Sequence, residues 1–155
     1  RVMGTQTSHK IIGKPERLSR EEYAQMKRHP EIGARILEPV AFLADVVPCV
    51  RHHHEWYDGS SNGYPSQLRA AQIPYPSRII LVADTVEAMT SDRPYSKALP
   101  FERVIEEIAT FSGTQFDPAV ADAFIRIAER EEEAFIETAS KFDIEAFVRG
   151  TWTAQ

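Results

Sequence analysis

The segment SRIILVADTVEAMTS, residues 77–91, limits most strongly how this chain can fold. Its apolar side chains recur at helical spacing and surround nearly the whole axis of the helix that they predict. We therefore expect a central, buried helix that other helices cover. No stretch of useful length alternates apolar and polar residues as a half-buried strand would, so the sequence predicts an all-α fold.

Helix-start signals and helical periodicity place further helices on both sides of this segment. Ser19 and Glu22 match the capping-box pattern, and Pro30 interrupts the helical pattern just after His29. Asp117 stands where a helix cap is expected, directly before Pro118. The predicted helices cover residues 20–28, 30–40, 41–54, 101–111, 118–137 and 142–150. Residues 55–75 and 92–100 are predicted loops.

Composition narrows the class of protein. The chain has 155 residues, 43% of them hydrophobic and 26% charged, which suits one folded domain. A net charge of -5 argues against binding to duplex nucleic acid, although local cations can still bind a small anion. Cys49 is the single cysteine, so no internal disulfide can form. With no apolar run of membrane-spanning length and no signal peptide, we expect a cytoplasmic protein.

The clearest chemical signal is His52-His53-His54-Glu55, followed by Asp58-Gly59 and then Gly63-Tyr64-Pro65. Neutral imidazole is a common ligand of transition metals, and neighbouring histidines point in different directions from a helix end. A solvated histidine cluster is the structural alternative. His29 before Pro30 fits either a ligand or a structural residue. A lone carboxylate in the apolar helix, Asp84, needs a metal or another partner to offset its desolvation.

Five strings taken together resemble the HD-GYP family, which hydrolyses cyclic di-GMP. They occur in the family's order and at near-family spacing, and they cover residues 14–124. The strings are KPERLSREEYAQMKRHPEIGARIL, HHEWYDG, GYP, VADTVEAMTSDRPYSKAL and SGTQFDPAVADAF. Each string alone is a weak signal, whereas the ordered set is specific.

The resemblance implies a helical bundle of the HD-domain type, with about six to seven helices and its N-terminal helices missing from this chain. It also implies two or three divalent metal ions, most often iron or manganese. The matching ligands are His29, His53, His54 and Asp84. Because Glu55 fixes the register of the HHE string, His52 is the additional histidine.

The resemblance further implies metal-dependent hydrolysis of cyclic di-GMP to linear pGpG, which can be cleaved on to GMP. The matching substrate-binding residues are Arg93, Lys97, Tyr64 and Gly63, although both cations also fit solvated loop positions. Tyr64 and Pro65 match the loop through which such a domain would dock a diguanylate cyclase. An upstream sensor or receiver domain is a common companion.

Two departures from the family pattern leave alternatives open. The loop reads DGSSNGYP where the family has DGSGYP, and no His-Asp pair precedes Lys14. We therefore treat residues 1–155 as a single, partial HD-GYP domain whose residues 1–12 are atypical. One alternative is a catalytically inactive cyclic di-GMP receptor or protein-interaction module. A weaker one is a general HD-type nucleotide phosphohydrolase, against which the GYP and SDRPY strings argue.

Overall fold

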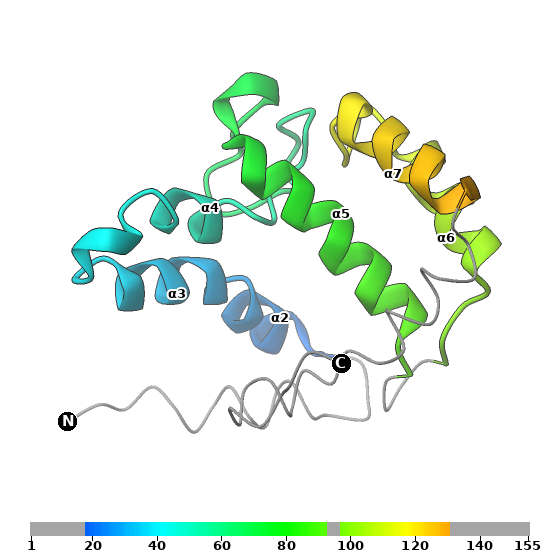
Figure 1. Ribbon diagram of the computed structural model, residues 1–155. Coiled ribbons are helices and arrows are strands. Elements are labelled where there is room, and N and C mark those ends of the chain that lie inside the picture. The colour runs from blue at the N-terminus through cyan, green and yellow to red at the C-terminus, as the bar shows by residue number, and fades with distance from the viewer. Residues whose placement is uncertain (1–17, 93–96, 131–155) are drawn as a thin grey trace, which may run out of the picture.

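A computed structural model of the chain describes residues 18–92 and 97–130. Within these ranges the fold consists of six α-helices and two short 3₁₀ helices, with no strand (Figure 1). The elements are α2 (Arg20–Met26), α3 (His29–Leu37), η1 (Ala41–Leu43), α4 (Val47–Arg51), η2 (Ala70–Gln72), α5 (Tyr75–Thr90), α6 (Phe101–Thr110) and α7 (Pro118–Arg130). The all-α prediction is confirmed.

Local signals in the sequence set the start of the first two helices. Ser19 Oγ accepts a hydrogen bond from Glu22 N at 3.3 Å, and Ser19 N donates to Glu22 Oε2 at 2.7 Å, which completes the predicted capping box of α2. Pro30 is the second residue of α3, where its missing N–H removes no helical hydrogen bond. His29 therefore stands at the start of α3 instead of before it.

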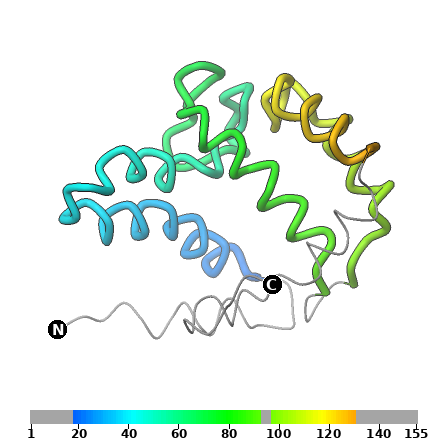
Figure 2. Tube along the Cα trace, viewed as in Figure 1, coloured from blue at the N-terminus to red at the C-terminus, as the bar shows by residue number. Residues whose placement is uncertain are grey.

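Helix α5 is the centre of the described fold. It crosses the molecule diagonally, with α4 packed on one side and α6 and α7 on the other (Figures 1 and 2). Its Leu81, Val82 and Val86 are buried against apolar residues of α6, α7 and the turn between them. The buried partners are Phe101, Val104, Ile108, Phe116, Val120, Ala121 and Ala128. This core anchors α5 as one wall of the site described below.

An ion pair joins α5 to the cap of α7. Arg78 donates from a guanidinium nitrogen to Asp117 Oδ2 at 2.6 Å, and both side chains are largely buried. Asp117 Oδ1 accepts from Ala119 N at 2.9 Å, so the predicted cap is confirmed.

Two expectations about the helices are wrong. Helix α5 is not buried all round, because the described helices cover only part of its surface: Ile79 is 45% exposed and Ile80 37%. The stretch 41–54 is not one helix. It forms η1 and the short α4, and α4 ends at Arg51, before the histidines. Pro48 explains the break, since it cannot donate to the carbonyl of residue 44 and instead takes an early position in α4.

The predicted helix 142–150 and the end of the predicted helix 118–137 lie outside the described residues. Among the helices of residues 18–92 and 97–130, none has the length and apolar character to span a membrane.

Candidate metal centre

Three histidines from two parts of the chain meet at one point. His29 is the first residue of α3, and His53 and His54 lie in the turn that follows α4. His29 Nε2 lies 3.3 Å from His53 Nε2 and 3.2 Å from His54 Nε2. One ligand atom from each of the three falls within 4.8 Å of the others. The structure thus brings together three of the four predicted metal ligands.

Backbone carbonyls fix the orientation of two of these rings. His29 Nδ1 donates to Met26 O at 2.7 Å, and His53 Nδ1 donates to Val50 O at 2.6 Å. Because a carbonyl oxygen only accepts, Nδ1 carries the proton in both neutral rings and Nε2 keeps its lone pair. Two lone pairs 3.3 Å apart repel each other unless a proton or a cation lies between them.

The separation of the nitrogens fits one metal ion. Two nitrogen ligands about 2.1 Å from a metal, at angles of about 90–110°, lie about 3.0–3.4 Å apart. The separations of His29 Nε2 from His54 Nε2 and His53 Nε2, 3.2 and 3.3 Å, fall in this range. Imidazole also suits iron and other first-row transition metals, so the three residues fit a divalent cation.

The surroundings of His53 and His54 keep these two imidazoles in the neutral form that metals bind. Burial, with smaller contributions from His53 and His29, lowers the pKa of His54 to about 3. Burial also lowers the pKa of His53, while its hydrogen bond to Val50 and the nearby Asp84 act in the opposite direction. His53 and His54 therefore stay in the neutral form near neutral pH.

His52, the additional histidine of the motif, makes a different contact. Its Nδ1 lies 3.2 Å from Glu55 Oε1, whereas its two neighbours face His29. Glu55 is 2% exposed and also accepts from Ser66 N at 2.7 Å and Leu68 N at 3.2 Å. The buried carboxylate thus anchors the loop after Tyr64. Motif matching alone did not reveal this role.

Tyr64 lies directly on the histidine cluster. Its ring stacks on the His54 ring with centroids 4.8 Å apart and an interplanar angle of 26°. Lys27 Nζ lies 5.0 Å from the centre of the Tyr64 ring and 5.1 Å from that of Tyr23. Burial raises the pKa of Tyr64, so its phenol stays neutral. The sequence analysis does not single out Tyr23 and Lys27. Their i, i+4 spacing at α2 is the signal that could have found them, because it places both side chains on one face of that helix.

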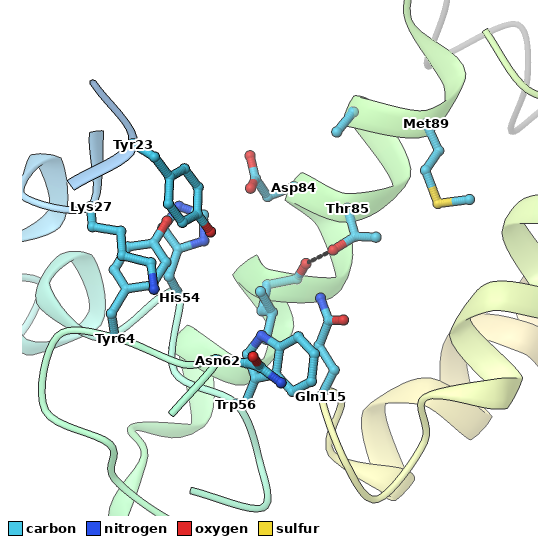
Figure 3. Close-up of a pocket in the computed structure, with 12 residues that line it drawn as sticks. Tyr23, Lys27, His54, Trp56, Asn62, Tyr64, Asp84, Thr85, Met89 and Gln115 are labelled. Carbon is cyan, nitrogen blue, oxygen red and sulfur yellow. Dashed lines mark hydrogen bonds between the residues drawn. The ribbon is translucent and has the colours of Figure 1, made fainter. Parts of the chain in front are cut away.

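Asp84 stands apart from the three histidines. It projects from α5 into the space between that helix and His54, but it is not part of the close group of ligand atoms (Figure 3). Asp84 is exposed, so the argument that burial forces it to coordinate a metal is wrong. The overestimated burial of α5 is the cause. Its role as a fourth ligand stays a prediction.

The remaining predicted residues differ in how far the structure describes them. Arg93 lies outside the described residues, and Lys97 is exposed in the segment that follows. Gly63 is buried, and a Cβ there would come 2.3 Å from Trp56 N, so close packing already accounts for this glycine. Tyr64 and Pro65 are joined by a cis peptide bond and are half-buried.

A cavity of about 490 Å³ opens beside the cluster, which is a size typical of small-molecule sites. It lies between α5, the end of α2 and the loops around residues 56–64 and 115 (Figure 3). His54, Tyr64 and Asp84 line it together with Lys27 and Trp56. A ligand in this cavity would touch both the histidine cluster and α5.

Known proteins resemble this chain in sequence and fold. A family model described as HD domain matches residues 5–120. A cyclic di-GMP phosphodiesterase of Vibrio cholerae is 37% identical over 139 residues, which is 85% of this chain and 27% of that protein. A cyclic di-GMP phosphodiesterase of Thermotoga maritima is 37% identical over 130 residues, 81% of this chain and 34% of that protein.

A solved structure of a cyclic GMP-AMP specific phosphodiesterase from V. cholerae has a TM-score of 0.58 at 19% identity, over 89% of this chain and 38% of that one. The likeness shows the fold, and the chain spans only 27% and 34% of the two curated relatives. HD-domain phosphohydrolases depend on metal, in agreement with the histidine cluster. By the match over residues 5–120 and its ordered motifs, this chain belongs to the HD-domain family, and its resemblance to the HD-GYP group is confirmed.

Proposed function

We propose that this chain forms part of a metal-dependent phosphodiesterase that hydrolyses cyclic di-GMP to pGpG, which can be cleaved on to GMP. The observation that carries the proposal is the convergence of three imidazole nitrogens beside a cavity of about 490 Å³. Two relatives at 37% identity are named cyclic di-GMP phosphodiesterases, which supports this choice of substrate. We also propose that the protein is cytoplasmic, as the sequence predicts.

In this proposal His29, His53 and His54 hold iron or manganese, and Asp84 adds a ligand from α5. When bound, divalent metal ions make hydroxide available near neutral pH and offset charge on a phosphate. The carbonyls that accept from His29 and His53 keep both Nε2 lone pairs directed at the metal position.

Cations near the cavity are proposed to bind the phosphates. Lys27 lines the cavity with its ammonium over the Tyr64 ring, which places positive charge close to the histidines. Tyr64 presents a neutral phenol to the same space, and Gly63 lets its loop pack closely enough to hold that ring there. Arg93 and Lys97 remain proposed phosphate ligands on the strength of the motif.

A second candidate function is a receptor that binds cyclic di-GMP without turnover. The sequence contains no His-Asp pair, and Asp84 stands outside the close ligand group. Three ligands can hold one metal ion, whereas two metal ions favour phosphodiester cleavage of this kind. Such a receptor would act through Tyr64 and Pro65 on a diguanylate cyclase, or on an upstream sensor or receiver domain. Because Tyr64 lies on His54, a ligand bound at the histidines would directly affect the loop that carries Tyr64 and Pro65.

The deciding experiment measures metal content per chain and hydrolysis of cyclic di-GMP on the same sample, purified with iron or manganese. Bound metal with release of pGpG is the expected result. Binding of cyclic di-GMP without product would select the receptor. A chain that neither retains metal nor binds any cyclic dinucleotide would contradict both functions. Assays with 3′3′-cGAMP in parallel separate the two substrate classes.

A further inference from the structure

The cavity has two chemically different ends. His54 and Lys27 lie at one end, where a phosphate would meet metal and positive charge (Figure 3). Trp56, Asn62 and Gln115 lie together at the other, facing α5 (Figure 3). This second end offers an aromatic ring and two primary amides, all uncharged. A nucleotide divides in the same way, into a charged phosphate and a flat, neutral base.

Trp56 is held in place by its neighbours. Its ring meets the ring of Phe111 in an edge-to-face arrangement, with centroids 6.4 Å apart and an interplanar angle of 66°. The next residue, Tyr57, donates from its backbone N–H to Gln115 O at 3.1 Å. The loop that carries Trp56 and the turn that carries Gln115 are therefore fastened together. The backbone of Gln115 therefore stays next to the residue that follows Trp56.

The two amides have hydrogen-bonding capacity that the described part of the chain does not use. Within residues 18–92 and 97–130, neither Asn62 nor Gln115 makes a side-chain hydrogen bond to another protein group. Each primary amide offers two N–H donors and one acceptor oxygen. The edges of purine bases present matching acceptors and donors, and Asn and Gln bind such edges in pairs of hydrogen bonds.

Asn62 enters the cavity from the segment that departs from the family pattern. It belongs to DGSSNGYP, which is longer than the DGSGYP of the HD-GYP motif. Asp58 Oδ1 accepts from Ser60 N at 2.8 Å, and Gly63 N donates to Ser60 O at 3.1 Å, so the longer loop has a defined turn. The additional length thus supplies a polar group to the wall of the cavity.

We propose that Trp56, Asn62 and Gln115 form a subsite for one purine base of a cyclic dinucleotide. The base lies against the indole, the two amides bind its hydrogen-bonding edge, and the phosphates stay at the histidine end. The subsite rests on the proposed function, since it takes the ligand to be a cyclic dinucleotide. The subsite would select the base, whereas the residues at the histidine end would bind metal and phosphate.

The test is calorimetric titration of the full, manganese-loaded chain with GMP, AMP, CMP and inorganic phosphate. Trp56→Ala is expected to weaken binding of a purine nucleotide by about 5- to 100-fold. Asn62→Ala and Gln115→Ala are expected to weaken it by about 3- to 10-fold each. Phosphate binding should be unchanged in all three. Losses confined to GMP would identify guanine, and losses confined to AMP would identify adenine.

Two controls separate base recognition from damage to the fold. Ser61→Ala changes an exposed side chain of the same loop that does not line the cavity, and it should bind like the wild type. Trp56→Phe keeps an aromatic ring and should retain more purine affinity than Trp56→Ala. Thermal melts confirm that each variant is folded.

Wild-type purine affinity in all three alanine variants would overturn the subsite, as would an equal loss of affinity for inorganic phosphate. If the wild-type chain meanwhile hydrolyses cyclic di-GMP, only the subsite fails and the proposed function stands. A wild-type chain that binds no cyclic dinucleotide would overturn both.

Discussion

At the scale of single residues, His52 and His54 stand two positions apart but contact different groups. His54 Nε2 lies 3.2 Å from His29 Nε2, whereas His52 Nδ1 lies 3.2 Å from the Glu55 carboxylate. The pair therefore offers a matched comparison of a proposed metal ligand with a histidine that has a structural partner.

We expect His54→Gln to lower the affinity for manganese by at least about 10-fold, because loss of even an outer-shell partner costs 10- to 100-fold. His52→Gln should change this affinity by less than about threefold, since His52 does not join the ligand group. The affinity is measured by titration of metal-free protein. Equal losses in both variants would show that the cluster is wrongly assigned.

Single residues also mark the limit of sequence reasoning at this site. His29, His53 and His54 were predicted because a motif names them, and they do converge. Lys27 and Gln115 are not predicted from the sequence, because their positions on the cavity wall exist only once the helices and loops have packed. Patterns identify residues whose chemistry is unusual in sequence. They do not identify ordinary residues that packing brings to a cavity.

At the scale of elements, the loop after the histidines depends on one buried group. The Glu55 carboxylate accepts from the backbone N–H groups of Ser66 and Leu68, and it pairs with His52. A buried acceptor of this kind holds a loop that has little regular structure of its own. The position of Tyr64 on His54 therefore depends on Glu55, which lies outside the metal cluster.

Glu55→Gln replaces one of the two acceptor oxygens by a donor and leaves an N–H group of the loop without a partner. We expect the free energy of unfolding to fall by about 1–3 kcal/mol, as measured by urea denaturation. Glu38→Gln is the control, because Glu38 pairs with Arg51 at the surface and should cost about 0–1 kcal/mol. A Glu55→Gln variant as stable as this control would rule out the anchoring role.

Helices were predicted best where their signals are local. The capping box starts α2, and the predicted helix 101–111 is present as α6, which buries Phe101, Val104 and Ile108. The surroundings of α5 were not predicted, because apolar content does not say which neighbours cover which side. The break before α4 follows from the missing N–H of Pro48, which is a local signal in the sequence.

At the scale of the whole molecule, the histidine cluster joins parts of the chain that pack separately from the main core. His29 begins α3 and the other two histidines follow α4, while the apolar core lies among α5, α6 and α7. Helix α5 contacts α4 as well as α6 and α7, so it connects the two regions. A metal held by the cluster would tie α3 to the turn after α4 and thereby stabilise the side of the fold away from the core.

Metal binding should therefore raise the stability of the whole chain. A metal that binds only the folded state, present at 100 times its dissociation constant, adds about 2.7 kcal/mol. For a chain of this length that corresponds to a rise in Tm of about 5–11 °C, measured by a thermal melt with manganese and then with a chelator. His54→Gln should lose most of the rise, while His52→Gln should keep it. If manganese leaves the Tm of the wild type unchanged, the three histidines do not hold the ion in the folded chain.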